Sequence, residues 1–353
     1  MMTVVNSISN VMNLVRPSVL ELTPYASAKD AFKDFKKDLI YMDANENPYQ
    51  SEWNRYPDPD QLALKEALSQ LNGISTDQLL LGNGSDEILD MIYRVFCEPK
   101  ADNVIINTPT FGMYKVLAGM HQIACKEVLL TNDFQLDIQR IVESVDTQTK
   151  ILFICSPNNP TGNLMNKEDV LSLVKSLNII VVIDEAYIDF ADSRSWLKEV
   201  VNYKNLIVTQ TLSKAYGMAG LRLGICYADA AVISLLKKVK MPYNVNILTQ
   251  KFALKNLENK SKFKKEISEI ILNKGALKSE LLQIAMVQKI YPSDANFLLV
   301  KVDDANKRYA QLLNNGIVVR NRNKEPMCEN CLRITVGTAM ENKKLIEVFK
   351  TLK

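Results

Sequence analysis

Short apolar runs alternate with amphipathic segments through the middle of the chain. Between residues 76 and 230, the β-rich runs are 103–107, 150–156, 178–184, 205–210 and 221–227. Segments beginning at Ser85 and Lys167 carry apolar residues at helical spacing. Continuous apolar strands joined by amphipathic helices predict a largely parallel sheet buried on both faces. In such sheets the ligand lies beyond the carboxyl ends of the strands.

A second pattern follows this one. Residues 247–286 form a lysine-rich helical stretch, which we interpret as a solvated helix or pair of helices. Beyond it, a compact α+β unit is predicted from strands at 296–302, 316–321 and 331–337 and helices at 307–313 and 342–352. We therefore expect an N-terminal segment at 1–50 that packs with this smaller unit, a large domain at 51–250 and a small domain at 251–353.

Composition and charge narrow the class of protein. The chain has 353 residues, of which 47% are hydrophobic and 24% are charged, as is typical of soluble globular proteins. A net charge of +3 argues against nucleic acid or an anionic membrane as the main partner. The lysine-rich run 260–266 could indicate nucleic-acid binding. Its interleaved acids and helical period favour instead the solvent-exposed face of a helix. Without a signal-like N-terminus or a spanning apolar window, we expect a cytoplasmic protein.

Cysteine and histidine usage argues against metal chemistry. Six cysteines lie mostly in apolar segments, which favours reduced core thiols. Cys328 and Cys331 form the one C-x-x-C pair, and we interpret them as two thiols in a loop. His121 is the single histidine, so triads that need histidine and sites with several histidines are poor candidates. We expect no metal.

Lys214 stands in TLSKAYGMAGLRLG, between a strand and a glycine-rich turn. A lysine at a strand end serves to contact phosphate, to form a salt bridge or to form a Schiff base, and the Walker pattern is absent. Scarce water and the nearby positive charge of Arg222 would lower its pKa toward the working range. A buried lysine paired with an acid fits this motif equally well.

Other strand ends carry polar and aromatic residues. Asp184 ends an apolar strand, so it should meet a cation such as a pyridinium nitrogen, cap a helix or bind Mg²⁺. Asn159 lies in the turn of CSPNNPTG. Ser85 and Asp86 begin a helix after two glycines and could bind phosphate. Phe111 could stack on a flat ring or belong to the core.

The order of these features resembles that of the fold type I pyridoxal-phosphate aminotransferases (class II) and, within them, the histidinol-phosphate aminotransferases, over essentially the whole chain. The matching segments are LTPY, ANENP, NRYPDP, GSDE, FCEP, PTFGMY, CSPNNPTG, DEAYIDF, TLSKAYGMAGLRLG and LRITVG. The resemblance implies an α/β fold with a large domain around a mostly parallel seven-stranded sheet and a smaller α+β domain.

The resemblance also implies a role for each cofactor residue. Lys214 would form the Schiff base with pyridoxal 5'-phosphate, Asp184 would pair with the ring nitrogen, and Asn159 and Tyr187 would bond the phenolic oxygen. Phe111 would stack on the ring, where the family often has tyrosine. The remaining cofactor residues would hold the phosphate: Ser85, Asp86, Thr211, Ser213 and Arg222. Tyr56 would reach the cofactor of the neighbouring subunit, which makes the protein a homodimer.

The implied reaction is transamination between L-histidinol phosphate and 2-oxoglutarate, in histidine biosynthesis. Arg333 matches the family's arginine for the substrate carboxylate, and Arg320 matches a second anion-binding position. Tyr25 and Asn45 would close over the substrate, with Asn159 beside it. Without the resemblance, both arginines would be interpreted as surface charges.

Rival functions share these residues. An aromatic amino acid aminotransferase or a threonine-phosphate decarboxylase has the same fold and cofactor set. A regulatory protein that binds the cofactor without turnover is a rival of another class.

Overall fold

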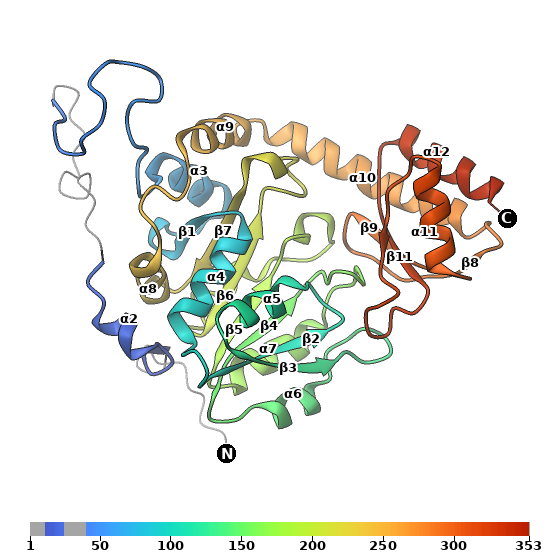
Figure 1. The fold of residues 1–353 in the computed structure, drawn as a ribbon, viewed down its shortest axis with the longest axis horizontal. Helices are drawn as coiled ribbons and strands as arrows, with labels where there is room; N and C mark the ends of the chain where they lie inside the picture. The colour runs from blue at the N-terminus through green and yellow to red at the C-terminus, as the bar shows by residue number, and fades with distance from the viewer. Residues whose placement is uncertain (1–10, 25–39, 353) are drawn as a thin grey trace.

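The computed structural model describes residues 11–24 and 40–352. Its largest layer is a seven-stranded sheet in the order β1-β7-β6-β5-β4-β2-β3 (Figure 1). The strands are β1 (Leu79–Asn83), β2 (Asn103–Thr108), β3 (Ala124–Leu129), β4 (Thr149–Cys155), β5 (Ile180–Asp184), β6 (Leu206–Thr211) and β7 (Leu223–Ala228). β2 to β6 pair in parallel, so the predicted, largely parallel sheet is confirmed.

One strand departs from the parallel pattern. β7 pairs antiparallel with both β1 and β6. The connection from β6 to β7 contains only the short 3-10 helix η5 (Ala219–Leu221), whereas a parallel neighbour needs a longer crossover, usually with a helix. The residues just before β7 therefore lie at the same edge of the sheet as the carboxyl ends of β5 and β6. Two further strands, β1 and β3, were not among the predicted ones; β3 is an edge strand with little buried surface.

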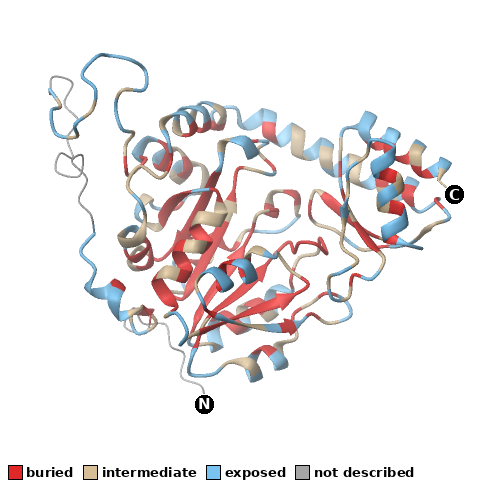
Figure 2. Cartoon of the chain, viewed as in Figure 1, coloured by how far each residue is buried: buried red, intermediate tan, exposed pale blue. Residues whose placement is uncertain are grey.

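Alternate strand residues build a separate core on each face of this sheet. Ile180 and Val182 join the core with α4 (Ser85–Phe96), α5 (Met113–Met120) and α8 (Ala230–Val239). Val181 and Ile183 join the other, with α3 (Leu62–Asn72), α6 (Ile138–Ser144) and α7 (Lys167–Ser176). The two cores follow from the period of two in a strand, and they leave the central strands fully buried (Figure 2).

A four-stranded antiparallel sheet forms the second unit, in the order β10-β11-β9-β8. Its strands are β8 (Val287–Ile290), β9 (Phe297–Val302), β10 (Arg320–Asn321) and β11 (Cys331–Thr335), and α11 (Ala305–Asn314) and α12 (Ala339–Thr351) pack against it. The stretch 247–286 contains two helices, α9 (Ile247–Leu257) and α10 (Lys260–Leu281). α10 runs from the large sheet to the small one (Figure 1). The domain boundaries at residues 50 and 250 stay a prediction.

Residues 11–19 of the N-terminal segment contact the large unit, which differs from the expectation that residues 1–50 pack with the smaller one. Val11, Val15 and Val19, spaced four residues apart, are buried in the core that contains α4 and α8. The last of them belongs to α2 (Pro17–Glu21). Arg16 Nε also donates to Glu98 at 3.0 Å. Apolar side chains with this spacing lie on one side of the segment, and they are buried against α4 and α8.

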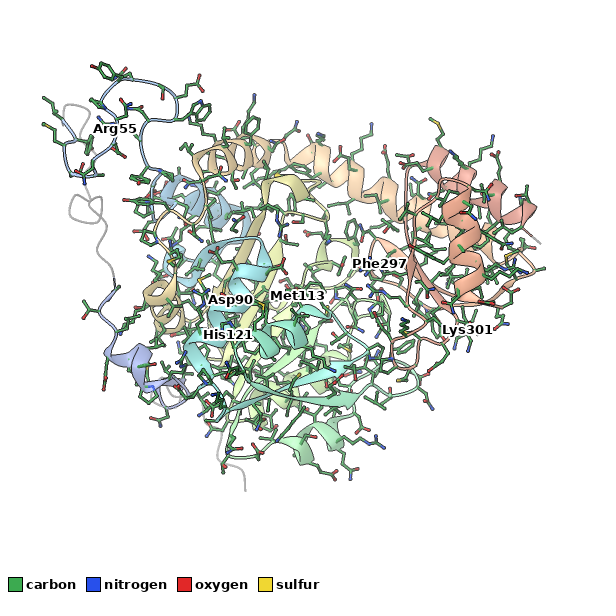
Figure 3. The ribbon with its side chains drawn as sticks, in the orientation of Figure 1. Arg55, Asp90, Met113, His121, Phe297 and Lys301 are labelled. Carbon is green, nitrogen blue, oxygen red and sulfur yellow. The ribbon has the colours of Figure 1, made fainter. Side chains whose placement is uncertain are left out.

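Residues 40–56 form a looped segment of bends and turns, here called the N-terminal arm, that projects from the body (Figure 1). Figure 3 places Arg55 in this arm, far from Phe297 of the small sheet. The side chains of Ile40 and Met42 are 88% and 91% exposed. In the parts of the chain that the structure describes, no helix is long and apolar enough to cross a membrane.

Candidate active site

A pocket lies at the edge of the large sheet where β4, β5 and β6 end. It is lined by Ser85, Asp86, Phe111, Cys155, Asn159, Asp184, Ala186, Tyr187, Thr211, Ser213, Lys214, Ala219 and Arg222. Except for Tyr56, every residue proposed from the sequence to hold a cofactor lines this pocket. They meet because the parallel strands end here, and because antiparallel β7 begins here, directly after Arg222.

Hydrogen-bond donors gather at one end of the pocket. Ser85 and Asp86 form the first turn of α4, whose free N–H groups attract anions. Arg222 Nη2 lies 3.3 Å from Asp86 Oδ2, and a Cβ at Gly84, where φ is +80°, would lie only 2.5 Å from that nitrogen. At Gly224, a Cβ would lie 2.3 Å from the Ser85 nitrogen. The two glycines thus make room for a cradle of donors that suits a phosphate.

Thr211 and Ser213 complete this cradle from the end of β6. Thr211 Oγ1 donates to Ser213 Oγ at 2.9 Å and accepts from the Ser213 backbone N–H at 3.1 Å. These bonds fix both hydroxyl groups at the pocket wall. Hydroxyl groups both donate and accept, so they can add to the bonds from α4 and Arg222.

A buried carboxylate faces the pocket from the end of β5. Asp184 is 3% exposed, its Oδ2 accepts from the Tyr114 hydroxyl at 2.8 Å and its Oδ1 accepts from the Ala186 N–H at 3.1 Å. Burial raises the pKa of Asp184. Among the residues that the structure describes, no lysine, arginine or histidine forms an ion pair with it. A buried carboxylate in this state is suited to a cationic ligand group, such as a protonated ring nitrogen.

Lys214 lies in the loop after β6, with its Nζ 5.7 Å from the centre of the Tyr187 ring. Its side chain is exposed, contrary to the expectation of scarce water, because it also lines a wider hollow of about 680 Å³ beside α10 and α12. The surrounding protein atoms nevertheless lower the pKa of Lys214, and the charges of Arg333 and Arg222 lower it further. The amine is therefore neutral more readily than that of a free lysine.

Two aromatic side chains line the pocket together with Asp184 and Lys214. Tyr187 is buried, and its ring packs edge-on against Phe297 at 5.1 Å. Burial raises the pKa of Tyr187, so its hydroxyl stays protonated and can donate. Phe111 packs against the edge of Tyr114 at 5.5 Å and lines the pocket, where its ring can stack on a flat ligand.

Asn159 connects the pocket to the small sheet. Arg333 Nη1 donates to Asn159 Oδ1, which leaves the amide nitrogen of Asn159 to donate to a ligand. The Arg333 guanidinium lies 5.2 Å above the Phe297 ring, and burial lowers the pKa of Arg333. Arg320 is the register partner of Arg333, so both side chains lie on one face of β10 and β11.

The structure adds residues that the sequence did not single out. Tyr114 bonds Asp184 and Cys155 lines the pocket. Arg322 Nη2 lies 3.5 Å from Asn159 Oδ1, and Arg322 also pairs with Glu325. Arg322 follows Arg320 by two residues, and in a strand that spacing places both on the same face. That spacing is the one signal by which the sequence could have indicated Arg322.

Tyr56 and Asn45, proposed to act across a dimer and over the substrate, do not line this pocket. Tyr56 is 49% exposed and stacks on Tyr243 with 4.5 Å between the ring centres. Asn45 lies on the N-terminal arm and is exposed. Tyr25 lies outside the described residues. Cys328 and Cys331 are buried free thiols. Within residues 11–24 and 40–352, no cluster of histidine, cysteine, aspartate and glutamate could hold a metal ion.

Comparison with known proteins relates this geometry to a family. Residues 22–349 match the model of the class I and II aminotransferases. The chain is 56% identical to a histidinol-phosphate aminotransferase of Flavobacterium psychrophilum, over 97% of this chain and 99% of that one.

Two solved structures share the fold. A histidinol-phosphate aminotransferase from Clostridium acetobutylicum superposes with a TM-score of 0.77 at 24% identity, covering 84% of this chain and 90% of that one. One from Sinorhizobium meliloti, in complex with pyridoxal-5'-phosphate, superposes with a TM-score of 0.76 at 23% identity, covering 85% and 84%.

Proposed function

The chain belongs to the class I and II aminotransferase family, and from this premise we propose that it transfers the amino group of L-histidinol phosphate to 2-oxoglutarate. The products are imidazole acetol phosphate and L-glutamate, and the reaction is a step of L-histidine biosynthesis. The observation that carries the proposal is the 56% identity to the Flavobacterium psychrophilum relative along 97% of the chain. The pocket beside Lys214 and the arginines beside Asn159 support it chemically.

We assign the pocket to pyridoxal 5'-phosphate, because its residues fit the three parts of that molecule. The donor cradle fits the phosphate, the buried Asp184 fits a cationic ring nitrogen, and Lys214 fits the aldehyde. When bound, pyridoxal phosphate supplies an aldehyde that condenses with primary amines and a ring that accepts electron density from the substrate.

The pocket residues then have distinct tasks. Asp184 keeps a proton on the ring nitrogen, since a buried carboxylate is most stable beside a positive charge. Tyr187 and the amide nitrogen of Asn159 would donate to the phenolic oxygen, and Phe111 would stack on the ring. The phosphate would be held by residues at the donor-rich end of the pocket: Ser85, Asp86, Thr211, Ser213 and Arg222.

Lys214 is the base and nucleophile of this proposal. Its lowered pKa keeps more of the amine neutral near physiological pH, as both tasks require. With cofactor and substrate bound, the free amine of Lys214 would take the proton from the substrate Cα. The positive charge of Arg333 favours the neutral amine before the substrate binds.

Arg333 and Arg320 bind the anionic end of each substrate in turn. A planar guanidinium forms paired hydrogen bonds with carboxylate and with phosphate, so one site accepts both glutamate and a phosphate monoester. Tyr25 and Asn45 are proposed to close over the bound substrate. Asn159 contacts both the cofactor and the substrate in this scheme.

A homodimer would complete the site with Tyr56 from the neighbouring subunit. In support, the N-terminal arm projects from the body, and Tyr56 does not line the pocket of its own chain as described. The exposed Ile40, Met42 and Tyr49 are apolar or aromatic surface that a second copy of the chain would cover. Light scattering after gel filtration measures the mass; a monomer at all concentrations would exclude this part of the proposal.

We also propose that the enzyme works in the cytoplasm. All six cysteines are free thiols, which is typical of proteins in reducing compartments. Cell fractionation with an antibody against the chain tests this location.

The function is tested by comparing amino donors. With 2-oxoglutarate as acceptor, kcat/KM is measured for histidinol phosphate, phenylalanine and phosphothreonine, and glutamate and carbon dioxide are both quantified. We expect the highest value for histidinol phosphate, with one glutamate formed per turnover and no carbon dioxide. Preference for either other donor would assign the chain to an aromatic aminotransferase or a threonine-phosphate decarboxylase instead.

A further inference from the structure

Arg322 is a third guanidinium on the face that carries Arg320 and Arg333. The register pairs Arg320 with Arg333 and Asn321 with Leu332, and the Arg322 N–H donates to the Cys331 carbonyl at 2.9 Å. The antiparallel pairing therefore continues one residue past β10. Since side chains alternate along a strand, Arg320, Arg322 and Arg333 share a face, here called the arginine face.

The tip of Arg322 reaches a residue of the cofactor pocket. Its Nη2 lies 3.5 Å from Asn159 Oδ1, the oxygen that also accepts a hydrogen bond from Arg333 Nη1. The charge of Arg322 lowers the pKa of the half-buried Arg333. Two guanidinium groups that converge on one neutral oxygen repel each other, and an anion between them would remove that repulsion.

Glu325 holds one end of Arg322 and leaves the other end available. Nη1 of Arg322 donates to Glu325 Oε1, and these side chains are 17% and 29% exposed. The Glu325 N–H donates to the Arg322 carbonyl at 2.9 Å, which closes a turn. Nε of Arg322 is buried and has no hydrogen-bond partner. Nε and Nη2 form one edge of the planar guanidinium, and an oxyanion binds such an edge through two parallel bonds.

The local charges identify the chemical class of that oxyanion. The arginine face has three positive groups, and one of them, Arg322, is paired with the carboxylate of Glu325. The excess of two positive charges matches a phosphate monoester, which carries close to two negative charges at neutral pH. On this edge of Arg322, Nε has no hydrogen-bond partner and Nη2 makes one long contact, 3.5 Å, with Asn159 Oδ1.

We propose that Arg322 is a specificity residue that binds the phosphate of the amino donor through its Nε and Nη2 edge, while Glu325 holds Nη1. This inference rests on the proposed function, because it concerns the donor of that reaction. It adds to Arg320 and Arg333 a residue that distinguishes phosphorylated from unphosphorylated donors.

The test compares the holoenzyme with the variants Arg322→Gln and Arg322→Lys. L-Histidinol phosphate and L-histidinol serve as matched donors that differ in the phosphate alone. We expect Arg322→Gln to lower kcat/KM about 10- to 100-fold more for the phosphorylated donor, mainly through KM, because a charged bidentate contact is lost. Arg322→Lys restores the charge without the paired geometry, so it should recover only part of the preference. Lys324→Gln, an exposed neighbour in the same loop, should leave the preference unchanged.

Calorimetric titration with inorganic phosphate separates this inference from the proposed function. If wild-type protein does not use histidinol phosphate, the function fails; weaker phosphate binding by Arg322→Gln than by wild type still supports the role of Arg322. If Arg322→Gln binds phosphate as wild type does and keeps the same donor preference, the inference is overturned while the function stands. An equal loss with both donors, with unchanged phosphate binding, also overturns it, because it indicates a structural role.

Discussion

The cofactor pocket and the arginine face use opposite means to position polar groups. In the pocket, Asp184 and Thr211 are the last residues of buried strands, and hydrogen bonds to backbone and hydroxyl groups fix them. On the arginine face, long side chains project from a two-residue strand at the edge of the small sheet. Arg320 is exposed, and Arg322 and Arg333 are in part solvated.

This difference suggests a division of labour. A rigid set of groups suits a cofactor that stays in place, whereas adaptable arginines suit two substrates that differ in shape and share an anionic end. The division predicts that pocket variants change the binding or spectrum of the cofactor. Variants of the arginine face should change substrate use while the spectrum of the resting enzyme stays the same.

The largest effect is expected in the pocket, from Lys214→Ala. This variant loses the nucleophile and the proton carrier together, so we expect kcat to fall on the order of 10⁴-fold or more. Thermal unfolding should change little, because the side chain is exposed. Treatment with borohydride followed by digestion should yield a reduced lysine adduct at position 214 in wild type and none in the variant. Lys264→Ala, at an exposed position of α10, is the control, and near-normal turnover by Lys214→Ala would contradict the assigned role.

On the arginine face, Arg333→Ala should have the next largest effect. Loss of a charge-assisted contact to the substrate should lower kcat/KM by about 100-fold in both half-reactions. Single-turnover absorbance with each substrate measures the two halves separately. The resting spectrum should be retained, and Arg140→Ala on the exposed surface should behave as wild type. A change confined to one half-reaction would show that the two anions bind at different places.

A third variant, Tyr114→Phe, affects the pocket without removing a proposed ligand of the cofactor. In wild type, the 2.8 Å hydrogen bond from Tyr114 lowers the pKa of Asp184. The variant loses this bond, so the pKa of Asp184 should rise. We expect the affinity for pyridoxal phosphate to fall by about 10-fold, because Asp184 then carries its charge less readily. Fluorescence titration of the cofactor-free protein measures the affinity. Tyr93→Phe is a matched buried tyrosine whose hydroxyl donates to the Tyr114 carbonyl, and it should reduce stability without changing that affinity.

The smallest expected effect is that of the Arg333 charge, on the arginine face, on the pKa of Lys214 in the pocket. The protonated amine of Lys214 cannot attack, so the rate at which cofactor-free protein takes up pyridoxal phosphate should rise with pH and level off above the lowered pKa of Lys214. Arg333→Gln removes a charge that lowers this pKa, so the rise should move to higher pH and uptake near neutral pH should slow by a few-fold. Stopped-flow absorbance across pH measures it, and an unmoved profile would show that the two regions are electrically independent.

The large sheet could be predicted because its strands are continuous apolar runs. β2 and β5 are buried along their length, β4 and β6 have one partly exposed residue each, and the residues that follow these strands stand out as polar or aromatic. Asp184 and Lys214 are therefore recognisable as candidates from the sequence alone. β3 has no such run because it is a partly exposed edge strand, and the direction of β7 depends on the length of its connection.

The arginine face could not be predicted in this way. β10 is only two residues long and exposed, so it leaves no apolar signal, and neighbouring arginines on such a segment have the pattern of surface charge. The bond from Arg333 to Asn159 spans 174 positions and depends on how the two sheets meet. The position of residues 11–22 likewise depends on the apolar surface left open on α4 and α8, which the local sequence does not contain.

The single oxygen of Asn159 has a consequence for how the protein would respond to compounds that it cannot convert. An inert dianion without an amine could draw Arg333 and Arg322 toward itself and release the amide to rotate. Since Asn159 also lines the cofactor pocket, occupancy of the arginine face would loosen one wall of that pocket without any substrate amine. Such a compound would therefore compete with both substrates through the arginine face alone, with no amine and no turnover.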